Sequence, residues 1–257
     1  MKNEDKFWDV GPHEYLAVED TFHEFIREIG ETIVADELSG DPNFNNADYL
    51  LRSRSVVAEL KEVETEFLKT SGAIKKQQEL IKKLLESNPN WKPHLLGGTE
   101  NYPDWFIVEY LRIARPPITR ILKKANKQIK DTKNHFNLPD APGVLFFVND
   151  GFTSIAPDLA AGIACDALVN SYSSIDCFVY LTLNRYIVLD GSNEPKLLWN
   201  PSYSSRSDDS LVDYIDDLGR KWFKFLDKKI NFTSERIEIQ DRNVLRNSKH
   251  LILPSEK

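Results

Sequence analysis

A continuous apolar run at residues 143–148, with the sequence GVLFFV, constrains the fold of this chain more than any other feature. A strand with one solvated face alternates apolar and polar residues, so this run predicts a strand that is buried on both faces. Residues 175–183 form a second apolar run that predicts a strand. Buried strands of this type belong to a sheet covered by helices, which indicates the α/β class.

Helical periodicity predicts the segments that cover such a sheet. Phe22, Phe25 and Ile26 recur at helical spacing in residues 21–38, and Ser39-Gly40 should end that helix. Three further segments have helical patterns, at residues 118–136, 157–169 and 208–229. The chain is therefore expected to alternate helices with the strands of one sheet.

No internal repeat and no obvious linker divides the sequence, so we expect a single domain over residues 1–257. Residues 64–115 are interpreted as a helical insertion within it, and residues 208–257 as a C-terminal helix and tail. Residues 105–113 fit either a strand or a short helix. The two prolines that follow them are expected to open the helix at residues 118–136.

Composition excludes several classes of protein. The net charge is −7, so the chain as a whole does not attract nucleic acid, and any such contact must come from a local patch. No apolar run approaches the ~20 residues of a membrane span, and the charged start of the sequence does not read as a secretory signal. Cys165 and Cys177 lack zinc-ligand spacing and are expected to be core thiols, which favours a cytoplasmic location.

An acid and a base lie among valines in the second of two predicted short strands. The strands are residues 47–51 and 55–63, joined by a charged tight turn. In the second strand, Glu59 and Lys61 share a face with Val57 and Val63 by the period of two. The opposite face is apolar and should meet the core. An ordinary half-buried strand would avoid charges at these positions.

The pattern of an acid two residues before a lysine is weak by itself, because the chain contains it five times. Only Glu59-Leu60-Lys61 lies inside an apolar strand that follows a strand with an aspartate, Asp48. The order of a helix, a strand with Asp, a strand with Glu-x-Lys, a basic helix and a buried strand is much harder to obtain by accident.

On these residues, the sequence resembles the PD-(D/E)xK nuclease superfamily, from about residue 21 to residue 148. The resemblance implies a restriction-endonuclease-like αβββαβ core, a mixed sheet flanked by helices, with the helical insertion and C-terminal elements added to it. It also implies a Mg²⁺-dependent nuclease, for which Mn²⁺ could substitute, acting on ester bonds and most simply on DNA. Asp48 and Glu59 would bind the metal, the carbonyl of Leu60 would be a further ligand, and Lys61 would lie beside the attacking water.

Two further positions follow from the same resemblance. Some members add a glutamate from the first helix, for which Glu24, Glu28 and Glu31 are candidates, and Glu28 is taken here as the metal ligand. Many members place a Gln or Lys on the helix after the sheet, which Gln128 or Lys130 could supply; Gln128 is taken as the catalytic residue.

The sequence departs from the superfamily pattern in two ways. Ala47 replaces the proline that gives the motif its name. The third core strand is not obvious in the long segment between residues 63 and 118, and residues 105–108 are the best candidate.

The chemistry gives independent reasons for these residue types. Phosphodiester hydrolysis needs an activated water and stabilisation of the charged phosphate, which a hard cation on carboxylate oxygens can provide. The Lys61 ammonium would stabilise the growing charge. Asp48 and Glu59 would in turn keep a buried Lys61 ionised.

The helix at residues 118–136 carries a basic stripe in an otherwise acidic protein. Between Arg115 and Lys133 there are seven Arg or Lys and one acid. We expect the stripe to bind nucleic acid through four of them: Arg120, Lys123, Lys127 and Lys130. The alternative is a solvated helix face.

Two other interpretations stay open. The chain could be a catalytically silent nuclease-fold module that binds nucleic acid or a protein partner, or an α/β protein whose Asp48, Glu59 and Lys61 form an edge-strand ion pair. The five histidines are scattered without metal-ligand spacing, and no glycine-rich nucleotide-binding loop occurs. A homodimer or a partner subunit is compatible with the sequence.

Overall fold

A computed structural model describes most of the chain. The described residues are 13–38, 44–93, 101–189, 192–230, 236–239, 241–245 and 248–252. All structural statements below refer to these residues.

The centre of the molecule is a six-stranded mixed sheet in the order β1-β2-β3-β4-β5-β8. β3, β4 and β5 are parallel, and the other pairs are antiparallel. All seven residues of β4 are buried, so the GVLFFV run is a strand covered on both faces, as predicted. The strands are β1 (Thr32–Ile33), β2 (Tyr49–Leu51), β3 (Val56–Val63), β4 (Gly143–Asn149), β5 (Cys177–Leu181) and β8 (Trp199–Tyr203).

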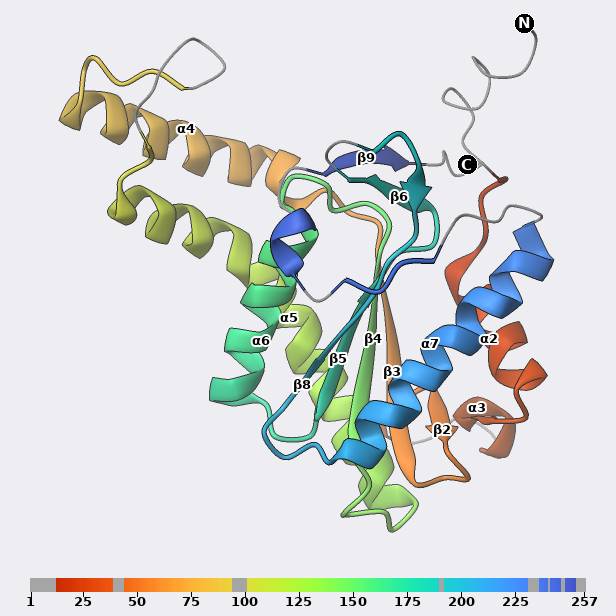
Figure 1. The fold of residues 1–257 in the computed structure, drawn as a ribbon. Coiled ribbons are helices and arrows are strands. Elements are labelled where there is room, and N and C mark those ends of the chain that lie inside the picture. The colour runs from red at the N-terminus through yellow and green to blue at the C-terminus, as the bar shows by residue number, and fades with distance from the viewer. Residues whose placement is uncertain are drawn as a thin grey trace, which may run out of the picture.

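Helices cover both faces of the sheet (Figure 1). On one face, α2 (Val18–Glu28) and α7 (Asp209–Ile230) pack on the side chains of β3 and β4 that include Leu60 and Phe146. On the other face, α5 (Asp104–His135) and α6 (Pro157–Ser171) pack on the alternate residues of the same strands. This arrangement confirms an α/β fold with a mixed sheet between helices.

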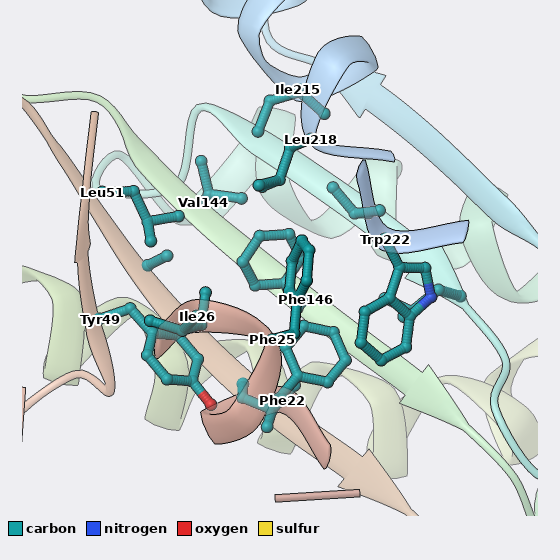
Figure 2. Close-up of a cluster of buried hydrophobic side chains, with 14 of the residues drawn as sticks. Phe22, Phe25, Ile26, Tyr49, Leu51, Val144, Phe146, Ile215, Leu218 and Trp222 are labelled. Atoms are coloured by element: carbon teal, nitrogen blue, oxygen red, sulfur yellow. The ribbon is translucent and has the colours of Figure 1, made fainter. Parts of the chain in front are cut away.

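Aromatic side chains fill the core between α2, α7 and the sheet (Figure 2). The Phe22 ring centroid lies 4.5 Å from that of Trp222 and 5.6 Å from that of Phe146. Phe25 meets Trp222 edge-on at 5.1 Å. These buried rings join the first helix to the last and fix both against β4, since aromatic pairs have preferred geometry as well as large buried area.

The first helix ends ten residues earlier than the helical pattern predicts. α2 stops at Glu28, and Gly30 follows with a positive φ of 74°, a conformation that glycine adopts without a Cβ penalty. The chain then forms β1 and the short helix α3 (Val34–Glu37). The predicted Ser39-Gly40 stop lies outside the described residues.

The prediction of a third core strand at residues 105–108 is wrong. These residues belong to α5, which continues through Pro116 and Pro117 to His135 as one 32-residue helix. The prolines were expected to open a helix, but they lie inside one, where the loss of two backbone donors favours a bend. The sheet obtains its additional strand from β1, which precedes Asp48 in the chain.

The first part of α5 forms a helical hairpin with α4 (Ser71–Ser87), and the hairpin projects from the sheet (Figure 1). Leu80 and Leu84 of α4 are buried there with Trp91 and Phe106. The short helix η1 (Phe67–Lys69) connects β3 to α4. Residues 64–115 contain η1, α4 and the first part of α5, and α5 continues beyond them to His135.

The C-terminal part adds a small second sheet in the order β7-β6-β9. Its strands are β6 (Arg185–Val188), β7 (Pro195–Lys196) and β9 (Lys249–Ile252), and η3 (Arg242–Leu245) precedes β9. None of the described helices is both long enough and apolar enough to cross a membrane.

Candidate active site

Asp48 and Glu59 lie opposite each other on the same face of the sheet. Asp48 directly precedes β2, whose register with β3 pairs Tyr49 with Ala58. Continued by one residue, this register places Asp48 against Glu59. Side chains alternate between the faces of a strand, so both carboxylates lie on the face covered by α5. Lys61 lies two residues further along that face.

The backbone around Asp48 is fixed on both sides. Its N–H donates to the Ala58 carbonyl at 3.1 Å, and its carbonyl accepts from the Val34 N–H at 2.9 Å. Its Oδ2 accepts a hydrogen bond of 2.7 Å from the backbone N–H of Leu60. One carboxylate oxygen of Asp48 is therefore anchored to the strand that carries Glu59 and Lys61.

The Leu60 hydrogen bond is available because β2 pairs with β3 only as far as Ala58. Beyond that point, the edge of β3 away from β4 carries no strand partner in the described sheet. The N–H and C=O of one strand residue point to the same edge. The Leu60 carbonyl accordingly faces the same uncovered edge as Asp48, as the resemblance requires of a backbone ligand.

α5 holds the segment just before Asp48. The Thr132 hydroxyl accepts from the Ala47 N–H at 2.7 Å, and Gln128 Nε2 donates to the Asn46 carbonyl at 2.9 Å. Ala47 and Thr132 are fully buried. Gln128 thus lies beside the candidate site, and its observed contact is with the backbone that positions Asp48. The Gln128 Oε1 atom is buried without a hydrogen-bond partner among the described residues.

Glu59 is fully buried and forms an ion pair with Lys61, whose side chain keeps 19 % of its exposure. The second carboxylate oxygen of Glu59, Oε2, is buried and has no hydrogen-bond partner in the described part of the chain. A buried carboxylate oxygen without a partner is costly, so this atom has unused capacity to bind a proton or a cation.

Burial and charge crowding shift both carboxyl groups toward the protonated form. Burial, and then the nearby Asp48, raises the pKa of Glu59 to about 8, against the opposing effect of Lys61. Burial also raises the pKa of Asp48, opposed by the Leu60 hydrogen bond and by Lys61. Two neighbouring carboxyl groups repel each other when both are ionised, so a bound cation would stabilise the doubly ionised pair. This electrostatic arrangement favours a cation site.

The structure places the three predicted first-helix glutamates against α7. Glu28 Oε1 accepts from Lys228 Nζ at 2.7 Å, and Glu24 pairs with Lys229. Glu31 accepts from the Tyr214 hydroxyl at 3.2 Å. Glu28, predicted as a metal ligand, is thus paired with Lys228 of α7 in this structure.

The first-helix acid that acts on the candidate site is Glu19. Its charge raises the pKa of Asp48, although by less than burial does. His23, one turn further along α2, meets the Tyr49 ring edge-on at 5.8 Å between centroids. Glu19 is absent from the predicted site because the predicted helix begins at residue 21. Helical spacing from Phe22 and Ile26 would have placed Glu19 beside the buried stripe of α2.

The basic island of α5 divides into three parts. The four residues predicted to bind nucleic acid are exposed, and no ion pair joins them to any described residue: Arg120, Lys123, Lys127 and Lys130. Lys133 is buried and donates to the Ser174 carbonyl at 3.2 Å. Arg115 pairs with Asp166 of α6. Lys124 is exposed beside the four predicted residues, so the local basic patch holds five of the seven residues of the island.

The residues present fit a hard divalent cation with few protein ligands. Across the described residues, no group of three or more His, Cys, Asp or Glu gathers as a metal cluster. Asp48 and Glu59 supply two carboxylates, and Leu60 supplies a carbonyl on the same edge. Mg²⁺ commonly takes only one or two carboxylates and keeps several waters, so this donor set suits it.

Comparisons with known proteins identify no relative. No protein-family model matches the chain, and no significant match was found among curated proteins or solved structures.

Proposed function

We propose that this protein is a metal-dependent nuclease that hydrolyses phosphodiester bonds, with DNA as its substrate. The observation that carries the proposal is the placement of Asp48 opposite Glu59 on one sheet face, with Lys61 paired to Glu59. Two acids and a lysine gathered at an uncovered strand edge could hold a cation and stabilise phosphate charge, as metal-assisted phosphate hydrolysis requires.

Each residue of this group has a distinct role in the proposed reaction. Asp48 and Glu59 would hold the cation, with the Leu60 carbonyl as a third donor. A bound Mg²⁺ would supply activation of water and neutralisation of phosphate charge. Lys61 is close enough to Glu59 to be oriented by it, and its ammonium would donate to the negative charge that grows on the phosphate. Gln128 and Thr132 would keep Asp48 in place through Asn46 and Ala47.

The order of the elements supports the same proposal. Along the chain, α2, β1, β2, β3, α5 and β4 follow one another as αβββαβ, with the short helix α3 inserted between β1 and β2, and η1 and α4 inserted before α5. β1, β2 and β3 are antiparallel neighbours, and β4 lies parallel to β3. This is the core order expected of the PD-(D/E)xK superfamily.

A substrate path along α5 also supports the proposal. Lys123, Lys127 and Lys130 are exposed on the helix that contacts the Asp48 segment through Gln128 and Thr132. In a chain of net charge −7, such a patch is the place where a nucleic-acid backbone would bind.

One observation favours the second candidate, a catalytically silent module. Glu59 is fully buried and already paired with Lys61, an arrangement that also stabilises a polar group with no chemical role. In that case, the basic residues of α5 would bind nucleic acid without cleavage.

A cleavage assay distinguishes the two candidates. Wild-type protein is incubated with single-stranded, duplex and branched DNA and with RNA, in Mg²⁺, in Mn²⁺ and in EDTA, beside binding measurements on the same substrates. Metal-dependent cleavage that EDTA abolishes and Asp48→Asn removes supports the nuclease. Binding without cleavage under every metal condition supports the silent module.

A further inference from the structure

α4 carries an exposed apolar stripe that no described part of the chain covers. Ile74, Ile81 and Leu85 keep 42 %, 37 % and 41 % of their exposure. They line a shallow hollow where α4 meets η1 and the loop after β4, together with Leu68 and Ser154. Scattered apolar residues are ordinary on protein surfaces, but an aligned set in a hollow indicates an interaction surface.

This stripe is separate from the one that holds α4 in place. Leu80 and Leu84 are buried against Trp91 and Phe106, and they join α4 to α5. Successive residues of a helix are 100° apart, so the exposed stripe is rotated by about a quarter turn from the buried one. The exposed residues are therefore not needed for the packing of the hairpin.

The spacing of the stripe matches the packing seam of a helix pair. Positions 74, 78, 81 and 85 follow the alternating intervals of four and three residues that define a coiled-coil seam. Three of these positions are large aliphatic residues and one is Gln78, which also lines the hollow. A single polar residue in an apolar seam is a common device for setting register between two helices.

Charge at the border of the stripe indicates the chemistry of its occupant. Lys75 and Lys82 flank the stripe, and Lys69 also lines the hollow, in which Glu86 is the one acid, 3.8 Å from Lys82. α4 contains four lysines and two glutamates in a chain of net charge −7. An antiparallel second copy would bring Lys75 of one chain against Lys82 of the other, which disfavours self-association.

We propose that this face of α4 is the docking surface for an amphipathic helix of a partner protein, whose apolar stripe is bordered by acidic residues. The partner helix would insert its apolar residues between Ile74, Ile81 and Leu85 and place its acids beside Lys75 and Lys82. The proposal does not depend on the Asp48 site, which lies on β2 and β3.

Two synthetic peptides test this proposal with the full-length protein. Both have three heptads with leucine at the seam positions, and they differ only in their flanking residues, glutamate in one and lysine in the other. Binding is measured by fluorescence anisotropy of labelled peptide. We expect saturable binding of the acidic peptide and at least tenfold weaker binding of the basic one. Ile81→Asp should abolish binding without changing the melting temperature, because Ile81 is exposed.

Matched charge variants on α4 provide the control. Lys82→Glu should weaken binding of the acidic peptide by about threefold, the scale of one exposed ion pair. Lys76→Glu makes the same charge change away from the stripe and should leave the affinity unchanged. Equal binding of both peptides, no saturable binding, or equal effects of the two variants would overturn the proposal. Sedimentation that shows a dimer dissociated by Ile81→Asp would also overturn it, because the occupant would then be a second copy.

Discussion

The carboxylate of Asp48 accepts a hydrogen bond of 2.7 Å from the backbone N–H of Leu60, the residue between Glu59 and Lys61. This single contact connects the two strands on which the candidate site depends. It exists because β2 ends its pairing at Ala58 and leaves the next N–H of that edge for a side chain.

Stability should depend on pH through Glu59. Folding raises the pKa of this carboxyl from 4.5 to about 8, mainly because Glu59 is buried. Its contribution to stability is complete below pH 4.5 and is lost as pH rises toward about 8, where the folded state must also release the proton. Between pH 4.5 and about 8, the unfolding free energy of the metal-free wild type should fall by at least about 1 kcal/mol more than that of Glu59→Gln. Urea unfolding in EDTA at several pH values measures this difference. The prediction is contradicted if the unfolding free energies of the two proteins change equally with pH.

Divalent-metal binding should distinguish Glu19 from Glu28, two acids of α2. Calorimetry with Mn²⁺ should show binding to wild type, with release of a proton at pH 7 because the pKa of Glu59 is about 8. Asp48→Asn should weaken binding by at least tenfold. Glu19→Gln should weaken metal binding by a smaller factor. Glu28→Gln should have no effect on metal binding, because Glu28 pairs with Lys228. A larger loss for Glu28→Gln than for Glu19→Gln would refute this assignment.

The hydroxyl of Thr132 should matter for stability and for the site together. Thr132→Val leaves the buried Ala47 N–H without its acceptor, which costs about 1–3 kcal/mol of unfolding free energy. It should also weaken Mn²⁺ binding, because Ala47 adjoins Asp48. Thr119→Val on the same helix is the control, since among the described residues the Thr119 hydroxyl donates only to the Pro116 carbonyl of its own helix. Urea unfolding and calorimetry of both variants test this; equal losses for the two would rule out the proposed role.

The basic patch of α5 should contribute through phosphate contacts. Replacing Lys123, Lys127 and Lys130 with alanine should weaken nucleic-acid binding uniformly across sequences. The slope of log K against log salt should become shallower by about three. Replacing Arg220, Lys221 and Lys224 on α7 with alanine makes the same change in net charge and should change the slope little. Binding isotherms at four salt concentrations measure these slopes, and an unchanged slope in the triple variant would make the patch a solvated helix face.

The strand pair that carries the site is predictable from sequence because it follows from local rules. The period of two assigns Glu59 and Lys61 to one face, and a tight turn after Leu51 sets the register that brings Asp48 opposite Glu59. The buried run at β4 is equally local, since every residue of it is apolar apart from its last, Asn149.

The structural features that the sequence pattern did not predict depend on tertiary contacts. β1 has two residues, too few for a pattern, and it is a strand because it pairs with Tyr49 and Leu50. Pro116 and Pro117 disfavour a helix interior, yet the packing of α5 on α4 and the sheet carries the helix across them. Lys133 belongs to a basic island but turns inward to the Ser174 carbonyl, which helical periodicity alone does not show.

The central claim is that Lys61 acts in the chemistry of the site, and single-turnover cleavage by wild type and Lys61→Met measures this most directly. Met keeps the aliphatic stem of the side chain and removes its charge. With Mg²⁺ and saturating DNA, the variant should cleave about 10²–10³-fold more slowly, the scale for the loss of one preorganised donor. DNA affinity should change by less than about twofold, because in the proposed role Lys61 would act on charge that develops only in the transition state. Equal cleavage rates for the two proteins would contradict the account, as would a wild type that binds DNA and cuts none.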